Sequence, residues 1–158
     1  MKKFISFVAL AFGMCLLLGS CQKDDSGINL DGYWYLSEWS SYDLNGKCRY
    51  RERATIDNAE IWIFVEDPKV YHIYSGNPKQ GYLWDEYIHD NIIDCLQHYT
   101  GLLISDFEII EKTDNNMAIK VYLVPIDDED NEIFAFTRSD KKHFDAWHEQ
   151  LIEYEFEI

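Results

Sequence analysis

From Gly32 onward the chain is a succession of short runs rich in aromatic and β-branched residues, each ended by turn-forming residues. Such runs favour the pleated, half-buried surface of a sheet, and the turns between them favour antiparallel hairpins. Asn45-Gly46 readily adopts the positive φ values of a tight hairpin, and Asp67-Pro68 interrupts a longer apolar stretch. We predict seven or eight strands, over residues 32–39, 47–53, the two arms of 60–75, 102–112, 117–126, 132–138 and 152–158.

Two segments have helical periodicity instead. In residues 83–99 the apolar side chains recur at three- and four-residue spacing, and Gly101 follows where a helix cap is expected; a further pair of strands is the alternative. In residues 139–151 the spacing of Phe144, Trp147 and Leu151 predicts a second helix with Ser139 as its N-cap. The expected fold is therefore mainly β: an antiparallel meander that forms a barrel or a strongly curved sheet, with one inserted and one C-terminal helix.

The first 20 residues have the composition of an export signal. The charged start "MKK" precedes residues 4–18, which are almost wholly apolar but fall short of the ~20 apolar residues that a membrane-spanning helix needs. The sequence Leu18-Gly19-Ser20-Cys21 resembles the bacterial lipobox. This resemblance implies that Cys21 becomes the first residue of the mature protein and carries lipid; an ordinary cleaved signal is the alternative.

These features predict a signal peptide at 1–20, a lipidated tether at 21–30 and one domain at 31–158. The lipid would hold the protein on a membrane surface without crossing it. The tract "QKDD" after Cys21 resembles the acidic export signal of surface lipoproteins of the Bacteroidota. We expect an outer membrane lipoprotein of the cell envelope. The sequence leaves open whether it lies on the periplasmic or on the surface-exposed face of that membrane.

The charge of the chain limits its partners. Residues 1–20 contain two of the 14 basic and none of the 29 acidic residues, so residues 21–158 have 12 basic and 29 acidic side chains and a net charge of −17. Such a surface repels phosphate backbones, which argues against nucleic acid as a partner. All five Trp and all eleven Tyr lie in this part of the chain, which is far too aromatic for a disordered segment.

Two cysteines remain after Cys15 leaves with the signal and Cys21 takes lipid. Cys48 and Cys95 would pair as a disulfide in an oxidising compartment if their Cα atoms lie within ~7 Å of each other. Two separate buried thiols are the alternative, and the helical spacing of residues 83–99 places Cys95 on the apolar side.

The residues Gly32, Tyr33 and Trp34 resemble the G-x-W motif on the first strand of lipocalin-like proteins. With the lipobox and the polar tether, "LDGYW" is similar to the start of small lipocalin-like lipoproteins of the Bacteroidota. The resemblance covers residues 30–138 and implies a structural pair, in which Arg138 packs over the Trp34 ring in a cation–π contact. The predicted helix after Gly81 departs from the continuous meander of that family.

Period-two alternation places Trp62 and Phe64 on one strand face, and His72 and Tyr74 on one face of the next strand. If these faces line the interior, they form an apolar pocket for a small ligand with a few polar groups. Core packing is the alternative explanation.

Catalytic and metal-binding signals are weak, and we predict no enzyme activity, no cofactor and no metal site. No nucleophile motif, phosphate-binding glycine loop or paired-cysteine metal motif is present. The i, i+4 pairs Asp85/His89 and Asp94/His98 fit a solvated helix face better than a metal site. The acidic run 127–132 lacks the glycine and the terminal glutamate spacing of a calcium-binding loop.

The sequence therefore predicts a lipid-anchored extracytoplasmic protein that binds a small apolar molecule without transforming it. A protein-interaction lipoprotein, such as an immunity, inhibitor or envelope-assembly factor that uses its acidic surface, is the second hypothesis. A hydrolase that uses carboxylates of the predicted helix or of the acidic run is the third.

Overall fold

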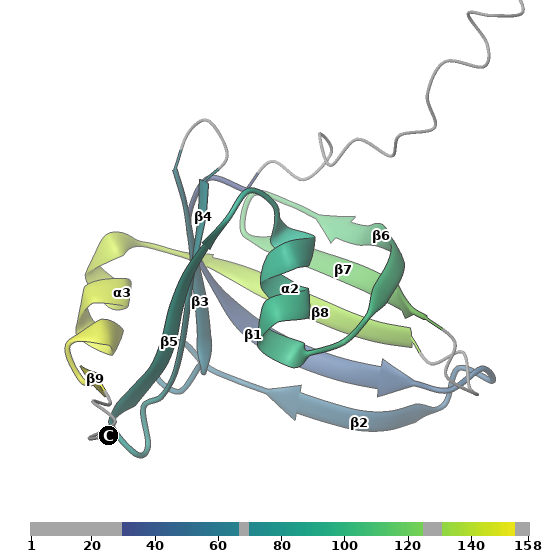
Figure 1. Ribbon diagram of the computed structural model, residues 1–158, viewed down its shortest axis with the longest axis horizontal. Coiled ribbons are helices and arrows are strands. Elements are labelled where there is room, and N and C mark those ends of the chain that lie inside the picture. The colour runs from purple at the N-terminus through teal and green to yellow at the C-terminus, as the bar shows by residue number, and fades with distance from the viewer. Residues whose placement is uncertain (1–29, 67–69, 125–130, 154–158) are drawn as a thin grey trace, which may run out of the picture.

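The computed structural model describes residues 30–66, 70–124 and 131–153. Within these ranges the chain forms nine strands and two helices (Figure 1). The strands are β1 (Gly32–Tyr42), β2 (Cys48–Arg53), β3 (Ile61–Glu66), β4 (Val70–Asn77), β5 (Tyr82–His89), β6 (Ile104–Lys112), β7 (Asn116–Leu123), β8 (Asn131–Ser139) and β9 (Ile152–Glu153). The helices are α2 (Ile92–Thr100) and α3 (Lys141–His148). Neither of these two helices has the length and apolar character to cross a membrane.

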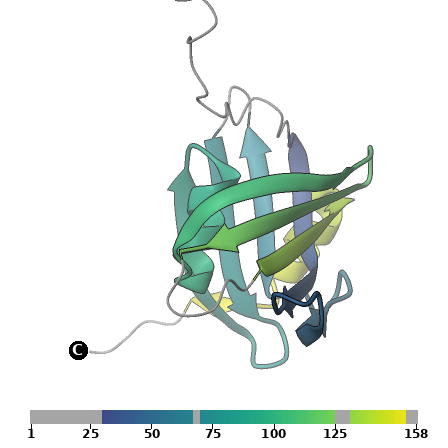
Figure 2. The same cartoon turned by 90° about the vertical axis from the view of Figure 1, so that its right-hand side faces the viewer.

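All strands belong to one sheet, in the order β6-β7-β8-β1-β3-β4-β5-β9, with β2 as a branch on β1. The pairings are antiparallel except that of β9, which runs parallel to β5. The sheet is strongly curved (Figure 2), and in the described residues no pairing joins β6 to β5 or β9. Of the two shapes expected from the sequence, the described chain has the curved open sheet.

The inner face of the curved sheet holds the main hydrophobic core. Strand residues of alternating position, such as Ile61 and Ile63 of β3 or Phe134 and Phe136 of β8, point into it and are almost fully buried. Helix α2 packs on this face, at the open side between β5 and β6 (Figure 1), and contributes Ile92, Cys95 and Leu96 to the core. The helix therefore covers apolar side chains that a closed barrel would cover with strands.

Helix α3 covers the outer face of the same sheet, opposite α2 (Figure 1). Trp147 of α3 packs against Trp62 with ring centroids 5.8 Å apart, and its indole Nε1 donates a hydrogen bond to the carbonyl oxygen of Ala59 at 2.8 Å. Phe144 and Leu151 join this second cluster. The sheet is thus apolar on both faces where β1, β3 and β4 lie between the two helices.

The inserted helix is shorter than its periodicity predicts. Residues 82–89 form β5, which pairs with β4, and the helix begins only after Asn91. The Asn91 side chain accepts a hydrogen bond from the backbone N–H of Asp94 at 2.8 Å, which satisfies a free donor of the first turn. Gly101 ends the helix with φ 69°, as expected.

Other boundaries differ by small amounts. Asp140, not Ser139, is the N-cap of α3, and its carboxylate accepts from the backbone N–H of His143 at 2.9 Å. Leu30, which we predicted to be the last residue of the tether, is buried in the inner core with 2% of its surface exposed. The hairpins at Asn45-Gly46, between β3 and β4, and between β6 and β7 are confirmed.

Candidate functional site

The sheet has a gap where β1 changes partners. Residues 32–35 of β1 pair with β3, residues 38–42 pair with β2, and Ser37 between them is a β-bulge. The bulge is held by its own polar groups: the carbonyl oxygen of Ser37 accepts from Ala54 N at 2.9 Å, and its hydroxyl donates to the carbonyl oxygen of Ala135 at 3.1 Å. The gap between β2 and β3 is therefore a fixed feature of the sheet.

A small pocket of about 60 Å³ lies in this gap. It is lined by side chains from five parts of the chain: Trp39 of β1, Glu52 of β2, Glu60 just before β3, Lys79 of the turn between β4 and β5, and Tyr99 of α2. We call it the gap pocket. Since ~10–15 Å³ of such space holds a water molecule, the gap pocket takes a group of a few atoms.

Aromatic rings form one side of the gap pocket. The Trp39 ring meets Tyr50 and Tyr99 edge-on, with centroids 5.8 Å and 6.3 Å away. The Trp39 indole Nε1 donates to a carboxylate oxygen of the buried Glu132 at 2.6 Å, which fixes the orientation of the ring. Pairing of Trp39 with Glu52 across β1 and β2 places that carboxylate on the same face.

Carboxylates give the gap pocket its electrostatic character. Burial raises the pKa of Glu60, and the charge of Glu52 raises it further, whereas the Lys79 ammonium lowers it. Burial, with the charges of Glu60 and Glu52, raises the pKa of Tyr99 to about 12. A hydrogen bond to Glu52 is the main cause that raises the pKa of Tyr50 to about 12. Both phenols are therefore neutral donors at pH 7.

A second pocket, of about 210 Å³, shares one lining residue, Tyr99, with the gap pocket. Its other walls are Ile73 and Ser75 of β4, Trp84, Asp85 and Tyr87 of β5, and His98 of α2. We call it the helix pocket. The Asp85 carboxylate lies 3.6 Å from His98 Nε2, and the Tyr87 and His98 rings have centroids 3.7 Å apart. These contacts tie α2 to β5 at the pocket wall.

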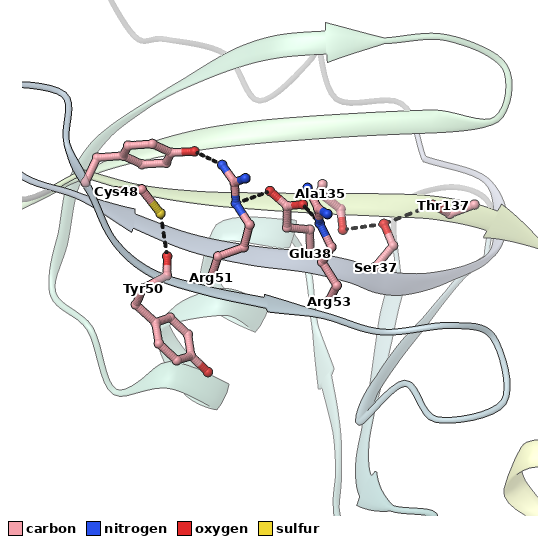
Figure 3. Close-up of polar contacts among 9 residues, drawn as sticks. Ser37, Glu38, Cys48, Tyr50, Arg51, Arg53, Ala135 and Thr137 are labelled. Atoms are coloured by element: carbon pink, nitrogen blue, oxygen red, sulfur yellow. Dashed lines mark hydrogen bonds and ion pairs between the residues drawn. The ribbon is translucent and has the colours of Figure 1, made fainter.

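The outer side of the gap has a different character. Glu38 forms ion pairs with Arg53 at 2.7 Å and Arg51 at 3.4 Å, and Arg51 also donates to the Tyr42 hydroxyl at 2.7 Å (Figure 3). A groove of about 620 Å³ runs from here over small side chains of β7 and β8, including Ala118 and Ala135. Arg51 and Arg53 on this face are thus already paired with acceptors.

The four residues that we predicted as ligand-lining do not lie on the inner face. Trp62 is fully buried under α3 against Phe144 and Trp147, and Tyr74 contacts the Phe144 ring at 4.9 Å. Phe64 stacks on Tyr33 at 4.4 Å and lies 5.8 Å from the His72 ring. Alternation does place each pair on one face, but that face is the outer one, and α3 packs over it. At Trp62 and Tyr74 the core-packing alternative fits the geometry.

Arg138 and Trp34 lie as expected from the sequence. The guanidinium carbon is 4.5 Å from the Trp34 ring centroid. Arg138 also donates to the Asp31 carboxylate at 2.8 Å and to the carbonyl oxygen of Asp114 at 2.6 Å. The hydrogen bond from Arg138 is the main cause that lowers the pKa of Asp31. The Arg138–Trp34 contact thus lies near the start of β1.

The two cysteines are separate free thiols, not a disulfide. Cys95 is buried in α2, whereas Cys48 is exposed on β2, so only one of them fits the buried-thiol alternative. Cys21, the predicted lipid attachment site, lies outside the described residues, and so does most of the acidic run 127–132.

Only one of the two predicted i, i+4 pairs lies on a helix. Asp85 and His89 lie on β5, and Asp94 and His98 on α2. Over residues 30–66, 70–124 and 131–153 no three His, Cys, Asp or Glu side chains are grouped in a way that could hold a metal ion. The contact between elements, His98 with Asp85, joins one member of each pair.

Apart from Asp85 and His98, which the i, i+4 spacing singled out, sequence reasoning assigned no site role to the residues that line the two pockets. One signal was available: the Asn45-Gly46 hairpin sets the register that places Glu52 beside Trp39. No sequence signal brings Glu60, Lys79 and Tyr99 to the same place, because they come from two connecting segments and a helix far apart in the chain.

Comparison with known proteins gives only distant likenesses. No family model matches the chain, and no curated protein matches it in sequence. Among solved structures, a dog lipocalin allergen is 15% identical, with 77% of this chain and 84% of that chain covered and a TM-score of 0.34. A deswapped triple mutant of bovine odorant-binding protein is 10% identical, with 75% and 81% covered and a TM-score of 0.32. The chain thus has a distant structural similarity to lipocalins, and no family is shown.

Proposed function

We propose that this protein is a binding module that holds a small ligand, without transforming it, where α2 ends against the β-sheet. The observation that carries this proposal is the pair of pockets that share Tyr99 as a lining residue. The helix pocket has Ile73 and the rings of Trp84 and Tyr87 in its walls, and the gap pocket adds the carboxylates of Glu52 and Glu60. Small-ligand sites commonly combine an apolar space with a few convergent polar groups in this way.

The size of the helix pocket limits the ligand. Its volume of about 210 Å³ exceeds the ~150 Å³ of an apolar cavity that binds benzene, so it accommodates a single ring or a short alkyl chain. Trp84 stands at this pocket with 48% of its surface exposed, which is a large apolar area to leave in water. A ligand that covers Trp84 would remove part of that area from solvent.

We further propose that the domain works as a lipid-anchored extracytoplasmic protein of the outer membrane. This proposal is supported by the lipobox-like sequence that ends at Cys21 and by the export-signal composition before it. Radiolabelled palmitate should enter the protein in living bacteria, and Cys21→Ser should abolish both the label and membrane association. Unchanged membrane association of that variant would contradict the anchor.

Binding at the helix pocket can be tested with benzyl alcohol, a neutral single-ring probe, by equilibrium dialysis against the full-length protein. We expect saturable binding that Trp84→Ala weakens by about two- to tenfold, since an aromatic contact contributes roughly 0.5–1.5 kcal/mol. The matched control is Ile88→Ala, on the same strand and 62% exposed, which lines neither pocket. Absence of saturable binding, or equal loss in both variants, would contradict a site here.

A further inference from the structure

The gap pocket has an unusual combination of walls for its size. The Trp39 and Tyr99 rings line it with centroids 6.3 Å apart, and Tyr50 contacts the Trp39 ring from outside the lining. The carboxylates of Glu52 and Glu60 belong to the same lining. The faces and π-electrons of aromatic rings attract cations, and carboxylates add charge-assisted hydrogen bonds. Such walls suit a positively charged group and disfavour an anion.

The cations already present do not neutralise these walls. Arg53, which also lines the pocket, is paired with Glu38 at 2.7 Å on the outer side of the gap. Lys79 is the remaining cation of the lining, against the two carboxylates Glu52 and Glu60. The buried Glu132, which accepts from Trp39, adds a third carboxylate behind the rings. One more positive charge in the gap pocket would therefore bring the local net charge closer to zero.

The volumes of the two pockets suggest how such a ligand is arranged. The gap pocket, at about 60 Å³, takes an ammonium group but not a ring, whereas the helix pocket, at about 210 Å³, takes a ring or short chain. Both are lined by Tyr99, so a ligand with its ring on one side of this side chain and its ammonium on the other would occupy both. In the helix pocket the Asp85 carboxylate faces His98 at 3.6 Å, which leaves the carboxylates of the gap pocket as the better partners for an ammonium.

We infer that the ligand is a small organic amine, bound with its ammonium between Glu52, Glu60 and the Trp39–Tyr99 rings and with its apolar part in the helix pocket. This inference rests on the proposed small-ligand site and adds the chemical class of the ligand. Lys79 is then a competitor for the same carboxylates, and its removal strengthens binding.

Three probes of one shape separate charge from size: benzylamine, benzyl alcohol and benzoate, measured by equilibrium dialysis against the full-length protein at pH 7. We expect benzylamine to bind about tenfold tighter than benzyl alcohol, and benzoate to bind weakest. Glu60→Gln should remove most of this preference, measured as the ratio of the Kd of benzyl alcohol to that of benzylamine. Lys79→Met should tighten benzylamine binding several-fold and raise the same ratio.

The control variant is Glu149→Gln, which makes the same charge change at the end of α3, on the opposite face of the sheet. It should keep the full preference for benzylamine. Equal binding of benzylamine and benzyl alcohol to the unmodified protein would overturn the amine inference and leave the small-ligand site standing. Failure of all three probes to bind would overturn both. A preference that Glu60→Gln and Glu149→Gln reduce equally would show attraction by overall charge and would overturn the gap pocket as the site.

Discussion

At the scale of single residues, the candidate site depends on one extra residue in β1. Ser37 has no cross-strand partner of its own, and it shifts the strand so that β3 and β2 pair with different halves of β1. Its hydroxyl also accepts from Thr137 Oγ1 at 2.9 Å, so the bulge is tied to β8 as well (Figure 3). Bulges of this kind redirect side chains next to functional sites, and here the bulge separates two strands enough to leave a pocket.

Glu60 should lower the stability of the protein at neutral pH. Burial raises the pKa of Glu60 in the folded state, so the ionised carboxylate costs folding free energy. Glu60 therefore adds stability below its unfolded-state pKa, where it is protonated in both states. This contribution is lost as the pH rises through the raised folded-state pKa. We therefore expect Glu60→Gln to raise the urea midpoint at pH 7 and to have no effect near pH 4. Urea unfolding at both pH values, with Glu149→Gln beside it, measures this. A lower midpoint at pH 7 would contradict the prediction.

The two free thiols should differ greatly in reactivity. Burial, with the nearby charges of Asp94 and Asp90, raises the pKa of Cys95 to about 12, and the side chain is fully buried. Since the thiolate is the reactive form, we expect iodoacetamide at pH 8 to modify exposed Cys48 within minutes and Cys95 about a thousandfold more slowly. Mass spectrometry of the two tryptic peptides follows the reaction. Protection of both until reductant is added would indicate a disulfide instead.

At the scale of elements, residues 82–100 show why periodicity misled. Trp84, Tyr87 and Ile88 have spacings that suit a helix, yet all three are at least two-fifths exposed, and hydrogen bonding to β4 makes this segment a strand. The apolar residues after Asn91 then form a helix of nine residues. The cap residues Asn91 and Gly101 were the more informative signals, because a cap is local chemistry whereas exposure depends on the whole fold.

Gly101 should matter to both stability and binding, because it ends α2 two residues after Tyr99. Its φ is +69°, and a Cβ there would meet no atom within 4 Å, so Gly101→Ala adds backbone strain alone, about 1–2 kcal/mol. Gly46→Ala is a matched control with φ +75° and equally free space, at the tip of the β1–β2 hairpin. Urea unfolding should show similar losses of stability. Only Gly101→Ala should also weaken benzyl alcohol binding, and equal binding by the two variants would contradict the role of α2.

At the scale of the whole molecule, the sequence predicts strands better than it predicts faces. Alternation correctly grouped Trp62 with Phe64, but the side of the sheet that they occupy depends on α3, some eighty residues later in the chain. Both faces of β3 are buried, so burial by itself does not mark the inner one. The same reasoning explains the site: Trp39 and Glu52 could be paired from one hairpin, whereas the approach of Glu60, Lys79 and Tyr99 is a property of the finished fold.

The acidity of the chain acts on the same scale. With a formal net charge of −15 over 158 residues, the molecule attracts small cations before any specific contact forms. This long-range attraction does not depend on the shape of the cation, and salt at 0.1 M screens it beyond about 10 Å. Specific recognition of an amine must therefore come from the gap pocket, and measurements at physiological ionic strength separate the two effects.

Arg138 should stabilise the whole molecule more than an ordinary surface cation, because it joins three distant parts of the chain. It packs on Trp34, pairs with Asp31 before β1 and donates to the carbonyl of Asp114 between β6 and β7. A cation–π contact contributes roughly 0.5–2 kcal/mol, and a hydrogen bond to a charged group contributes about 1.5–3 kcal/mol before solvent screening. We therefore expect Arg138→Met to lower the free energy of unfolding by about 2 kcal/mol.

The comparison for Arg138 is Lys141→Met on α3, which removes a single exposed i, i+4 ion pair with Asp145 at 2.6 Å. That pair should contribute only about 0.3–0.5 kcal/mol. Arg138→Lys should recover part of the loss, since an ammonium keeps the charge over the ring but lacks the guanidinium fork that reaches Asp31 and Asp114 together. Urea unfolding of the three variants at pH 7 tests this order, and equal effects of Arg138→Met and Lys141→Met would show that the contacts with Trp34 and Asp114 add no stability.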